Sequence, residues 1–258
     1  MPLTKHEGMF KKKKIYLTRL RAILLVSLPM CCAMSFSLIP CVQENSAPVV
    51  RIISPINKSL FRWNADVQYT IQVSDKEDGN SEYDEINGSE VLMHIMYLPD
   101  TLKATHYRSG KLTEEEPCAI TLMKTSTCFS CHTSRSKLIG PSFDRIASKY
   151  NYSEETVAGL TQKIMHGSKG VWGDVQMPSN TDLKPEEITE VVSWILKNNN
   201  EPNVFYQSGL KGTIRIKEKN EKDTGKGVYV LTASYIDHGL VNKPQLKKRG
   251  LHTIILKP

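Results

Sequence analysis

Cysteine is scarce in most of this chain. Only three of its six cysteines lie beyond residue 41, and two of these, Cys128 and Cys131, are separated by just two residues. This spacing argues against the disulfide framework that six cysteines in an exported protein would otherwise indicate. The third, Cys118, is expected to be a half-buried free thiol on a helix.

Excess basic charge is likewise absent beyond residue 41. The formal net charge is +7, but residues 1–41 hold seven Lys and Arg residues against the single acid Glu7, so they contribute +6 and leave +1 for residues 42–258. A nucleic-acid-binding domain needs a basic face on its folded surface. The sequence therefore predicts no nucleic-acid partner. Its hydrophobic content of 40% is that of a globular protein, and 258 residues suffice for two small domains.

Long hydrophobic runs are absent except at Ala22–Val42, an uncharged stretch that reads AILLVSLPMCCAMSFSLIPCV and follows a basic N-terminal segment. Basic residues before an apolar stretch are typical of an export signal, which we place at residues 1–41. Because Lys and Arg stay on the cytoplasmic side of the membrane, the rest of the chain is expected in the periplasm or on the outer surface.

Three outcomes remain open for this signal. Leu38-Ile39-Pro40-Cys41 resembles a lipoprotein cleavage box, although Pro40 stands where that pattern has a small residue, and lipidation would then fall on Cys41. An uncut signal can instead serve as an anchor, because about 20 uncharged residues span a bilayer. Ordinary cleavage would leave a free protein. We expect membrane attachment through the N-terminus, by lipidated Cys41 or by the uncleaved stretch.

The chain beyond the signal divides into three segments by hydrophobic periodicity. Residues 47–101 and 211–258 contain short runs rich in β-branched and aromatic residues, which predict strands. Residues 113–200 have helical periodicity, with Ser153 as the cap of one helix. That helix is expected to stop at Gly167, and Pro185 suits the first turn of the next one. Strands are expected at 49–53, 67–73, 91–97, 212–216, 228–235 and 253–256.

The segment order β, α, β favours an insertion. Each β segment offers about three strands, too few to cover its own apolar face, whereas together they have about 100 residues, the size of an Ig-like sandwich. Tyr229, Leu231, Ala233 and Tyr235 alternate along one strand and are expected to point inward. The predicted fold is therefore multidomain α and β, with an all-α domain inserted in or flanked by an Ig-like β-sandwich.

One motif indicates a cofactor-binding site, the run Cys128-Phe129-Ser130-Cys131-His132. Two residues between the cysteines place both sulfurs along one edge of a haem, and the adjacent imidazole can turn under the iron. The composition of the chain predicts only about 0.004 chance occurrences of this pattern. The sequence thus predicts one covalently attached haem c, with His132 as an iron ligand.

Other metal chemistry is a weaker interpretation. A cysteine pair at this spacing also serves as a redox dithiol or as half of a zinc site, but zinc needs two further ligands, and Cys118 is the one other cysteine beyond the signal. The acidic run Asp75–Gly79, with Asp84 and Glu85, has the oxygen ligands that calcium prefers. We expect a solvated loop there, and no metal ion besides the haem iron.

Residues 117–200, about a third of the chain, resemble a small bacterial class I cytochrome c. The matching stretches are Cys128 to His132, Ile139-Gly140-Pro141, Gly167 to Gly173, Gln176-Met177-Pro178 and Asn180. The resemblance implies that Gly140 and Pro141 lie beside the histidine ligand, that Trp172 contacts a haem propionate, and that Met177 is the sixth iron ligand. Lys163 stands where the family often has a basic residue near the propionates, and Asn180 where it has a residue near the methionine sulfur.

The setting of Met177 supports its role independently of the resemblance. It lies in a loop rich in Gly, Pro and Asn, where a methionine of the core would be poorly supported. Because 45 residues separate it from His132, the chain has room to cross to the opposite haem face. His166 is the rival sixth ligand, but a histidine at a helix end is more often a solvated partner of the helix dipole.

A thioether ligand raises the reduction potential and occupies the open iron position, which favours electron transfer. The alternative is a haem enzyme or gas sensor with a displaceable distal ligand. The β segments, including the run Gly227 to Asp237, also resemble the Ig-like region that accompanies cytochrome c modules in Bacteroidetes sugar-dehydrogenase-like proteins. That resemblance implies a separate dehydrogenase as electron donor and a respiratory carrier as acceptor. We therefore expect an electron-transfer protein and not an enzyme.

Overall fold

The computed structural model describes residues 44–99, 116–198, 203–221, 223 and 225–258. The predicted export signal over residues 1–41, with Cys41, lies outside the described residues, as do the segment ends 100–101, 113–115 and 199–200. Within the described ranges, every helix is too short or too polar to cross a membrane.

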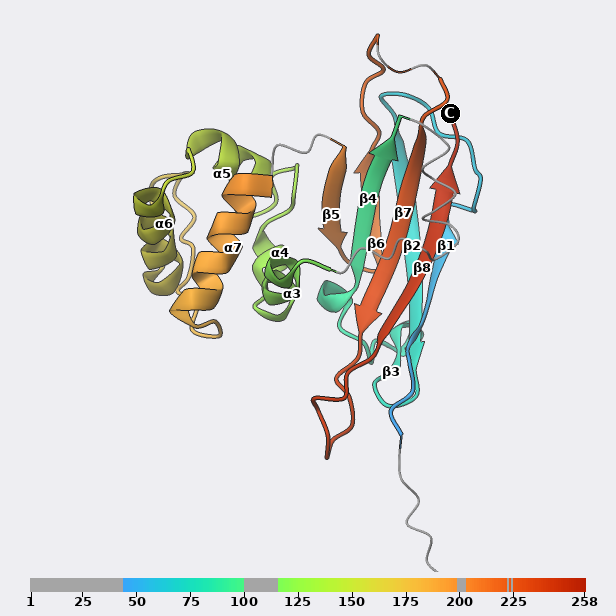
Figure 1. The fold of residues 1–258 in the computed structure, drawn as a ribbon, viewed down its shortest axis with the longest axis horizontal. Coiled ribbons are helices and arrows are strands. Elements are labelled where there is room, and N and C mark those ends of the chain that lie inside the picture. The colour runs from blue at the N-terminus through green and yellow to red at the C-terminus, as the bar shows by residue number, and fades with distance from the viewer. Residues whose placement is uncertain (1–43, 100–115, 199–202, 222, 224) are drawn as a thin grey trace, which may run out of the picture. The chain divides into compact units, whose positions relative to one another are not determined.

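The described strands form two four-stranded sheets, and every pairing between strands is antiparallel (Figure 1). The first sheet contains β1 (Val49–Ser54), β2 (Asp66–Asp75), β3 (Gly79–Asn80) and β6 (Lys211–Arg215). The second contains, in spatial order, β5 (Val204–Ser208), β4 (Leu92–Leu98), β7 (Val228–Ile236) and β8 (Arg249–Leu256). All six strands expected from the sequence are confirmed, with ends that differ by a few residues.

Each sheet contains strands from both sides of the helical segment. β2 pairs with β6, with Thr70 opposite Lys211. β4 lies between β5 and β7, with Ile95 opposite both Phe205 and Leu231. The two β segments therefore complete each other's sheets. The sequence pattern does not predict β5, whose five residues alternate poorly, and its pairing with β4 is a tertiary effect.

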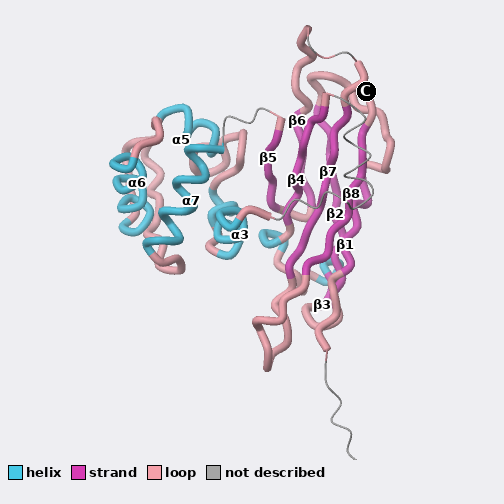
Figure 2. The backbone as a smooth tube through the Cα atoms, viewed as in Figure 1, coloured by secondary structure: helices cyan, strands magenta, loops and turns pink. Residues whose placement is uncertain are grey.

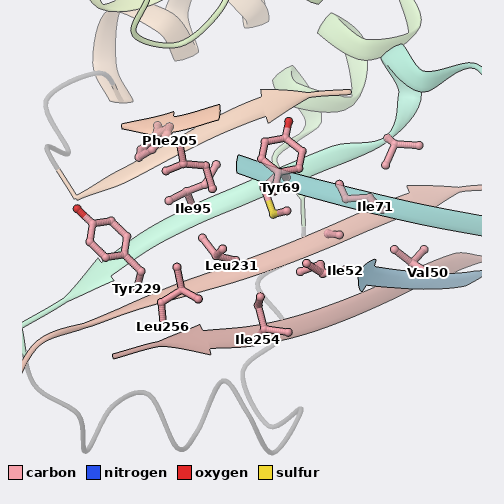
Figure 3. Close-up of a cluster of buried hydrophobic side chains, with 14 of the residues drawn as sticks. Val50, Ile52, Tyr69, Ile71, Ile95, Phe205, Tyr229, Leu231, Ile254 and Leu256 are labelled. Atoms are coloured by element: carbon pink, nitrogen blue, oxygen red, sulfur yellow. The ribbon is translucent and has the colours of Figure 1, made fainter. Parts of the chain in front are cut away.

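The two sheets pack face to face around one hydrophobic core (Figure 3). The alternation predicted on β7 is confirmed, because Tyr229, Leu231, Ala233 and Tyr235 are all buried in this core. The first sheet contributes from its facing strands Val50, Ile52, Tyr69, Ile71 and Val73. Burial of apolar area of this size is the main stabilising term for a sheet pair.

Five helices occupy the described part of the segment between β4 and β5, and Figure 2 shows them grouped apart from the strands. They are α3 (Cys118–Thr125), α4 (Cys128–Cys131), α5 (Phe143–Lys149), α6 (Glu154–His166) and α7 (Pro185–Asn198). The predicted start of α6 is confirmed, since the Ser153 hydroxyl accepts the backbone N–H of Thr156. The predicted stop is also confirmed, because α6 is followed by Gly167 at a φ of 78°. Pro185 begins α7, as expected.

The helical segment also contacts the second sheet directly. Ser134, two residues after the cysteine and histidine motif, donates its hydroxyl to the carbonyl oxygen of Tyr206 in β5 at 2.6 Å and accepts the Tyr206 N–H at 3.2 Å. The buried carboxylate of Glu116 pairs with Lys124 of α3 at 2.7 Å and accepts the Ser234 hydroxyl of β7 at 3.3 Å. These contacts join the two parts in addition to the chain connections.

Two expectations from the sequence are wrong. Cys118 is exposed rather than half-buried, because the inward positions of the first turn of α3 are taken by Ala119 and Ile120. The acidic run is not a freely solvated loop. Asp75 is buried and its carboxylate accepts two backbone N–H groups, while Asp78 accepts the Tyr235 hydroxyl at 2.7 Å. Within the described ranges, no group of three or more His, Cys, Asp or Glu residues is arranged to hold a metal ion.

Candidate functional site

The cysteine and histidine motif forms the single helical turn α4. The backbone N–H of His132, directly after this turn, donates to the carbonyl oxygen of Cys128 at 3.0 Å. The residue before the turn, Thr127, has left-handed backbone with a φ of 62°, which redirects the chain between α3 and α4. Cys128, Cys131 and His132 all line one cavity, so the fold brings two thiols and an imidazole to the same space.

The environment of Cys128 fits poorly with a redox dithiol. Burial raises the pKa of its thiol above the ordinary value, and the sulfur lies 3.3 Å from the Ser126 hydroxyl. A reactive dithiol needs the opposite shift, because the thiolate is the nucleophile. Two thiols beside an imidazole are instead the donor set that binds haem covalently and ligates its iron.

A hydrogen bond fixes the orientation of the His132 ring. Its Nδ1 lies 2.6 Å from the carbonyl oxygen of Pro141. A carbonyl oxygen only accepts, so Nδ1 carries the proton and Nε2 keeps its lone pair. This is the arrangement in which a histidine ligates a metal while its other nitrogen donates to a second group.

Gly140 is required by its contact with the same ring. A Cβ atom at this position would lie 2.8 Å from Nδ1 of His132, closer than real Cβ contacts allow. The Gly140 N–H also donates to the carbonyl oxygen of Cys131 at 2.8 Å. On another side the Phe143 ring stacks near the imidazole, with 5.6 Å between ring centroids. The structure therefore places Gly140 and Pro141 beside His132, where the resemblance put them.

Met177 lies in a loop that lines the same cavity and is closed by backbone hydrogen bonds. Met177 and Ser168 exchange two backbone hydrogen bonds of 2.9 and 3.0 Å, which close the loop at its base. Gly167 permits this closure, because a Cβ there would lie 2.8 Å from the Met177 carbonyl oxygen and its φ is positive. The loop holds the methionine in one place although it belongs to no helix or strand.

The other site residues predicted from the sequence differ in whether they line the cavity. Lys163, Trp172 and Asn180 line the cavity, whereas His166 does not. The exposed His166 ring contacts Gln162 of its own helix at 3.1 Å instead. The Asn180 side chain accepts the N–H groups of two following residues and donates to the carbonyl oxygen of Ser126 at 3.5 Å, so it ties the methionine loop to the end of α3.

The cavity has a volume of about 610 Å³, within the range of cofactor sites. Its apolar lining includes Met123, Phe143, Ile146, Leu160, Ile164, Val191 and Ile195. Arg145 and Lys149 of α5 also line it, although no sequence motif singles them out. Their spacing of four residues on a short helix was a signal, because it puts two cations on one helical face. The apolar lining, the donor set and the glycine contact with His132 all fit a covalently bound haem.

Comparisons with known proteins agree with this fit. Residues 120–199 match the family model described as Cytochrome c. The chain is 41% identical over 75 residues to cytochrome c-551 of Pseudomonas denitrificans, which covers 29% of this chain and 90% of that protein. It is 36% identical over 75 residues to cytochrome c-552 of Nitrosomonas europaea, covering 29% and 73% respectively. The crystal structure of wild-type Nitrosomonas europaea cytochrome c552 aligns at 36% identity over 30% of this chain and 94% of that chain, with a TM-score of 0.29.

Proposed function

This chain belongs to the class I cytochrome c family through residues 120–199, and from this we infer that it is an exported, membrane-associated electron carrier with His132 and Met177 as its iron ligands. Members of this family bind haem c covalently, so the cofactor here is one haem c. The thiols of Cys128 and Cys131 would form the covalent bonds to the haem, because their spacing matches one haem edge.

The observation that carries the ligand assignment is the hydrogen bond from His132 Nδ1 to the Pro141 carbonyl oxygen at 2.6 Å. It leaves Nε2 as the ring nitrogen with a free lone pair, held at the cavity. Met177 supports the same proposal from a loop closed by backbone hydrogen bonds on the cavity wall.

The haem supplies reversible one-electron chemistry at its iron, and the chain supplies position and electrostatics. With haem bound, Met177 would hold the iron position at which a substrate or gas could otherwise bind, and a thioether there would favour the reduced form. The apolar lining, which includes Met123 and Ile195, would exclude water from a bound haem and so also raise its reduction potential. Both effects suit a carrier that accepts and returns electrons without chemistry of its own.

A visible spectrum tests this assignment. With His132 and Met177 as ligands, the oxidised protein is expected to have a weak absorption band at about 695 nm. The reduced protein is expected to bind little carbon monoxide. A haem enzyme or gas sensor would lack the band and bind carbon monoxide readily, and that result would overturn the proposal.

We further propose that a separate dehydrogenase donates the electrons and that a respiratory carrier accepts them outside the cytoplasmic membrane. The basic and apolar start of the chain supports export, with attachment through lipidated Cys41 or through the uncut stretch Ala22–Val42. Mass spectrometry of the mature N-terminus distinguishes these two forms. A free protein that begins near Val42 would contradict both.

The β segments are proposed to form one Ig-like domain that carries the cytochrome as an insertion. The pairing of β2 with β6 and of β4 with β5 and β7 supports this, because neither segment alone has all its strand partners. A haem domain held at both ends, with Ser134 bonded to β5, has a restricted orientation toward a redox partner.

A further inference from the structure

The loop between β7 and β8 combines exposed apolar side chains with exposed lysines. Residues 241–248 of this loop are all exposed. Val241 is 100% exposed and Leu246 is 48% exposed, so both present apolar surface to the solvent. The charged residues of the same stretch are all basic, namely Lys243, Lys247 and Lys248. Apolar side chains flanked by lysines are typical of segments that lie at the surface of an anionic bilayer.

A buried carboxylate at the base of the β7–β8 loop fixes its shape. The Asp237 side chain accepts the N–H groups of Gly239 at 3.0 Å and of Lys248 at 2.8 Å, and Asp237 is 0% exposed. Further along the loop, the Lys243 N–H donates to the carbonyl oxygen of Leu240 at 2.8 Å. Val241 therefore belongs to a tight turn whose hydrogen bonds hold its side chain away from the core.

The start of the described chain is bonded to this loop. The Asn45 side-chain amide donates to the Asp237 carboxylate at 2.8 Å and to the carbonyl oxygen of Leu246 at 2.7 Å. Figure 1 shows the start of the described chain and the β7–β8 loop at the same end of the sheets. Cys41 precedes Asn45 by four residues, and a chain spans at most about 3.6 Å per residue. An attachment at Cys41 therefore keeps Asn45 within about 14 Å of the lipidated residue.

The lysines of the loop keep their charge available for a partner. Two acids that contact the loop, Asp78 and Glu90, each have a carboxylate oxygen 3.1 Å from a ring nitrogen of His238. Across the described part of the chain, no carboxylate forms an ion pair with any of the three lysines. Lysine ammonium groups near a bilayer are attracted to its anionic headgroups.

We propose that the β7–β8 loop docks on the bilayer to which the N-terminus is attached, with Val241 and Leu246 among the headgroups and the three lysines on anionic phosphates. The loop is bonded to the segment that leads to the proposed attachment point, and its charge complements an anionic lipid surface. The inference rests on the proposed membrane attachment. With a tether and a docked loop, the sheets keep one orientation toward the bilayer.

Hydrogen–deuterium exchange of the haem-loaded full chain tests the proposal, in phosphatidylglycerol vesicles and in uncharged phosphatidylcholine vesicles. Backbone amides of residues 240–248 are expected to exchange several-fold more slowly in the anionic vesicles. V241D and the double variant K243Q/K247Q are expected to remove this difference. I56D is the matched control, because Ile56 is 75% exposed in the loop after β1, which has no hydrogen bond to Asn45.

Equal exchange of the loop in the two kinds of vesicle would overturn the docking, and so would an unchanged difference in V241D and K243Q/K247Q. Sedimentation of the parent protein with vesicles at about 1 M salt tests the N-terminal attachment separately, because salt screens the lysines but does not release a lipidated or anchored chain. Loss of sedimentation at high salt would contradict that attachment, whatever the exchange of the loop shows.

Discussion

Met177, as the proposed sixth ligand, would close the iron to outside ligands. Met177→Ala is expected to leave the haem covalently attached, because the proposed attachment residues are Cys128 and Cys131 and not Met177. The reduction potential falls, since axial ligands set potentials over a range of roughly 0.8 V and the thioether favours reduced iron. Redox titration and carbon monoxide binding measure both effects. Met165→Ala is the control, because Met165 packs between α6 and α7 and does not line the cavity. This substitution is expected to leave the reduction potential unchanged.

Gly140 tests the histidine side of the site. In Gly140→Ala the new methyl group meets the imidazole at 2.8 Å from Nδ1, so either His132 or the loop must move. Overpacking of this kind costs about 1–3 kcal/mol, and the hydrogen bond to Pro141 weakens with it. Thermal unfolding and the electronic spectrum are the measurements. Gly159→Ala is the matched control, because its Cβ meets open space within α6 and is expected to stabilise by about 1 kcal/mol. Equal stability of the two variants would contradict the contact with His132.

At the scale of elements, the junction of α3 and α4 stores strain. Thr127 is β-branched, yet its φ is 62°, a left-handed conformation that such residues rarely adopt. Non-glycine residues in this region cost about 1–3 kcal/mol. Thr127→Gly is therefore expected to stabilise the haem-loaded protein by about 1 kcal/mol, after allowance for the greater freedom of glycine in the unfolded chain. Denaturant unfolding measures the change in the free energy of unfolding. A loss of stability would show that the threonine side chain makes a contact that stabilises the protein by more than the backbone strain costs.

At the scale of the whole molecule, the cavity and the sheet core are separate sources of stability. The sheets have their own buried core, whereas α3 to α7 surround a cavity of about 610 Å³ that a haem would fill. In Cys128→Ala with Cys131→Ala, covalent haem is lost and the helical segment is expected to unfold first, with the sheets unfolding later. Calorimetry should then show two transitions. Cys118→Ala, which changes an exposed cysteine, should behave like the parent. Haem retained after acid–acetone extraction of the double variant would contradict the attachment site.

Much of the site follows from sequence alone, because its chemistry is local. The two cysteines and His132 lie within five residues, so covalent spacing fixes their arrangement before any packing occurs. The caps of α6 are equally local, since Ser153 and Gly167 act on the backbone beside them. Alternation along β7 also predicts its inward face, because side chains on a strand point to opposite sides.

Tertiary structure decided the features that depend on distant partners. β5 forms because it pairs with the edge of β4, and the short sequence of β5 does not by itself predict a strand. The exposure of Cys118 depends on which face of α3 packs inward. Arg145 and Lys149 became part of the site only when α5 placed them over Trp172, a residue 23 positions further along the chain than Lys149. Packing between elements sets such contacts, and a periodic pattern records which face is buried but not what it meets.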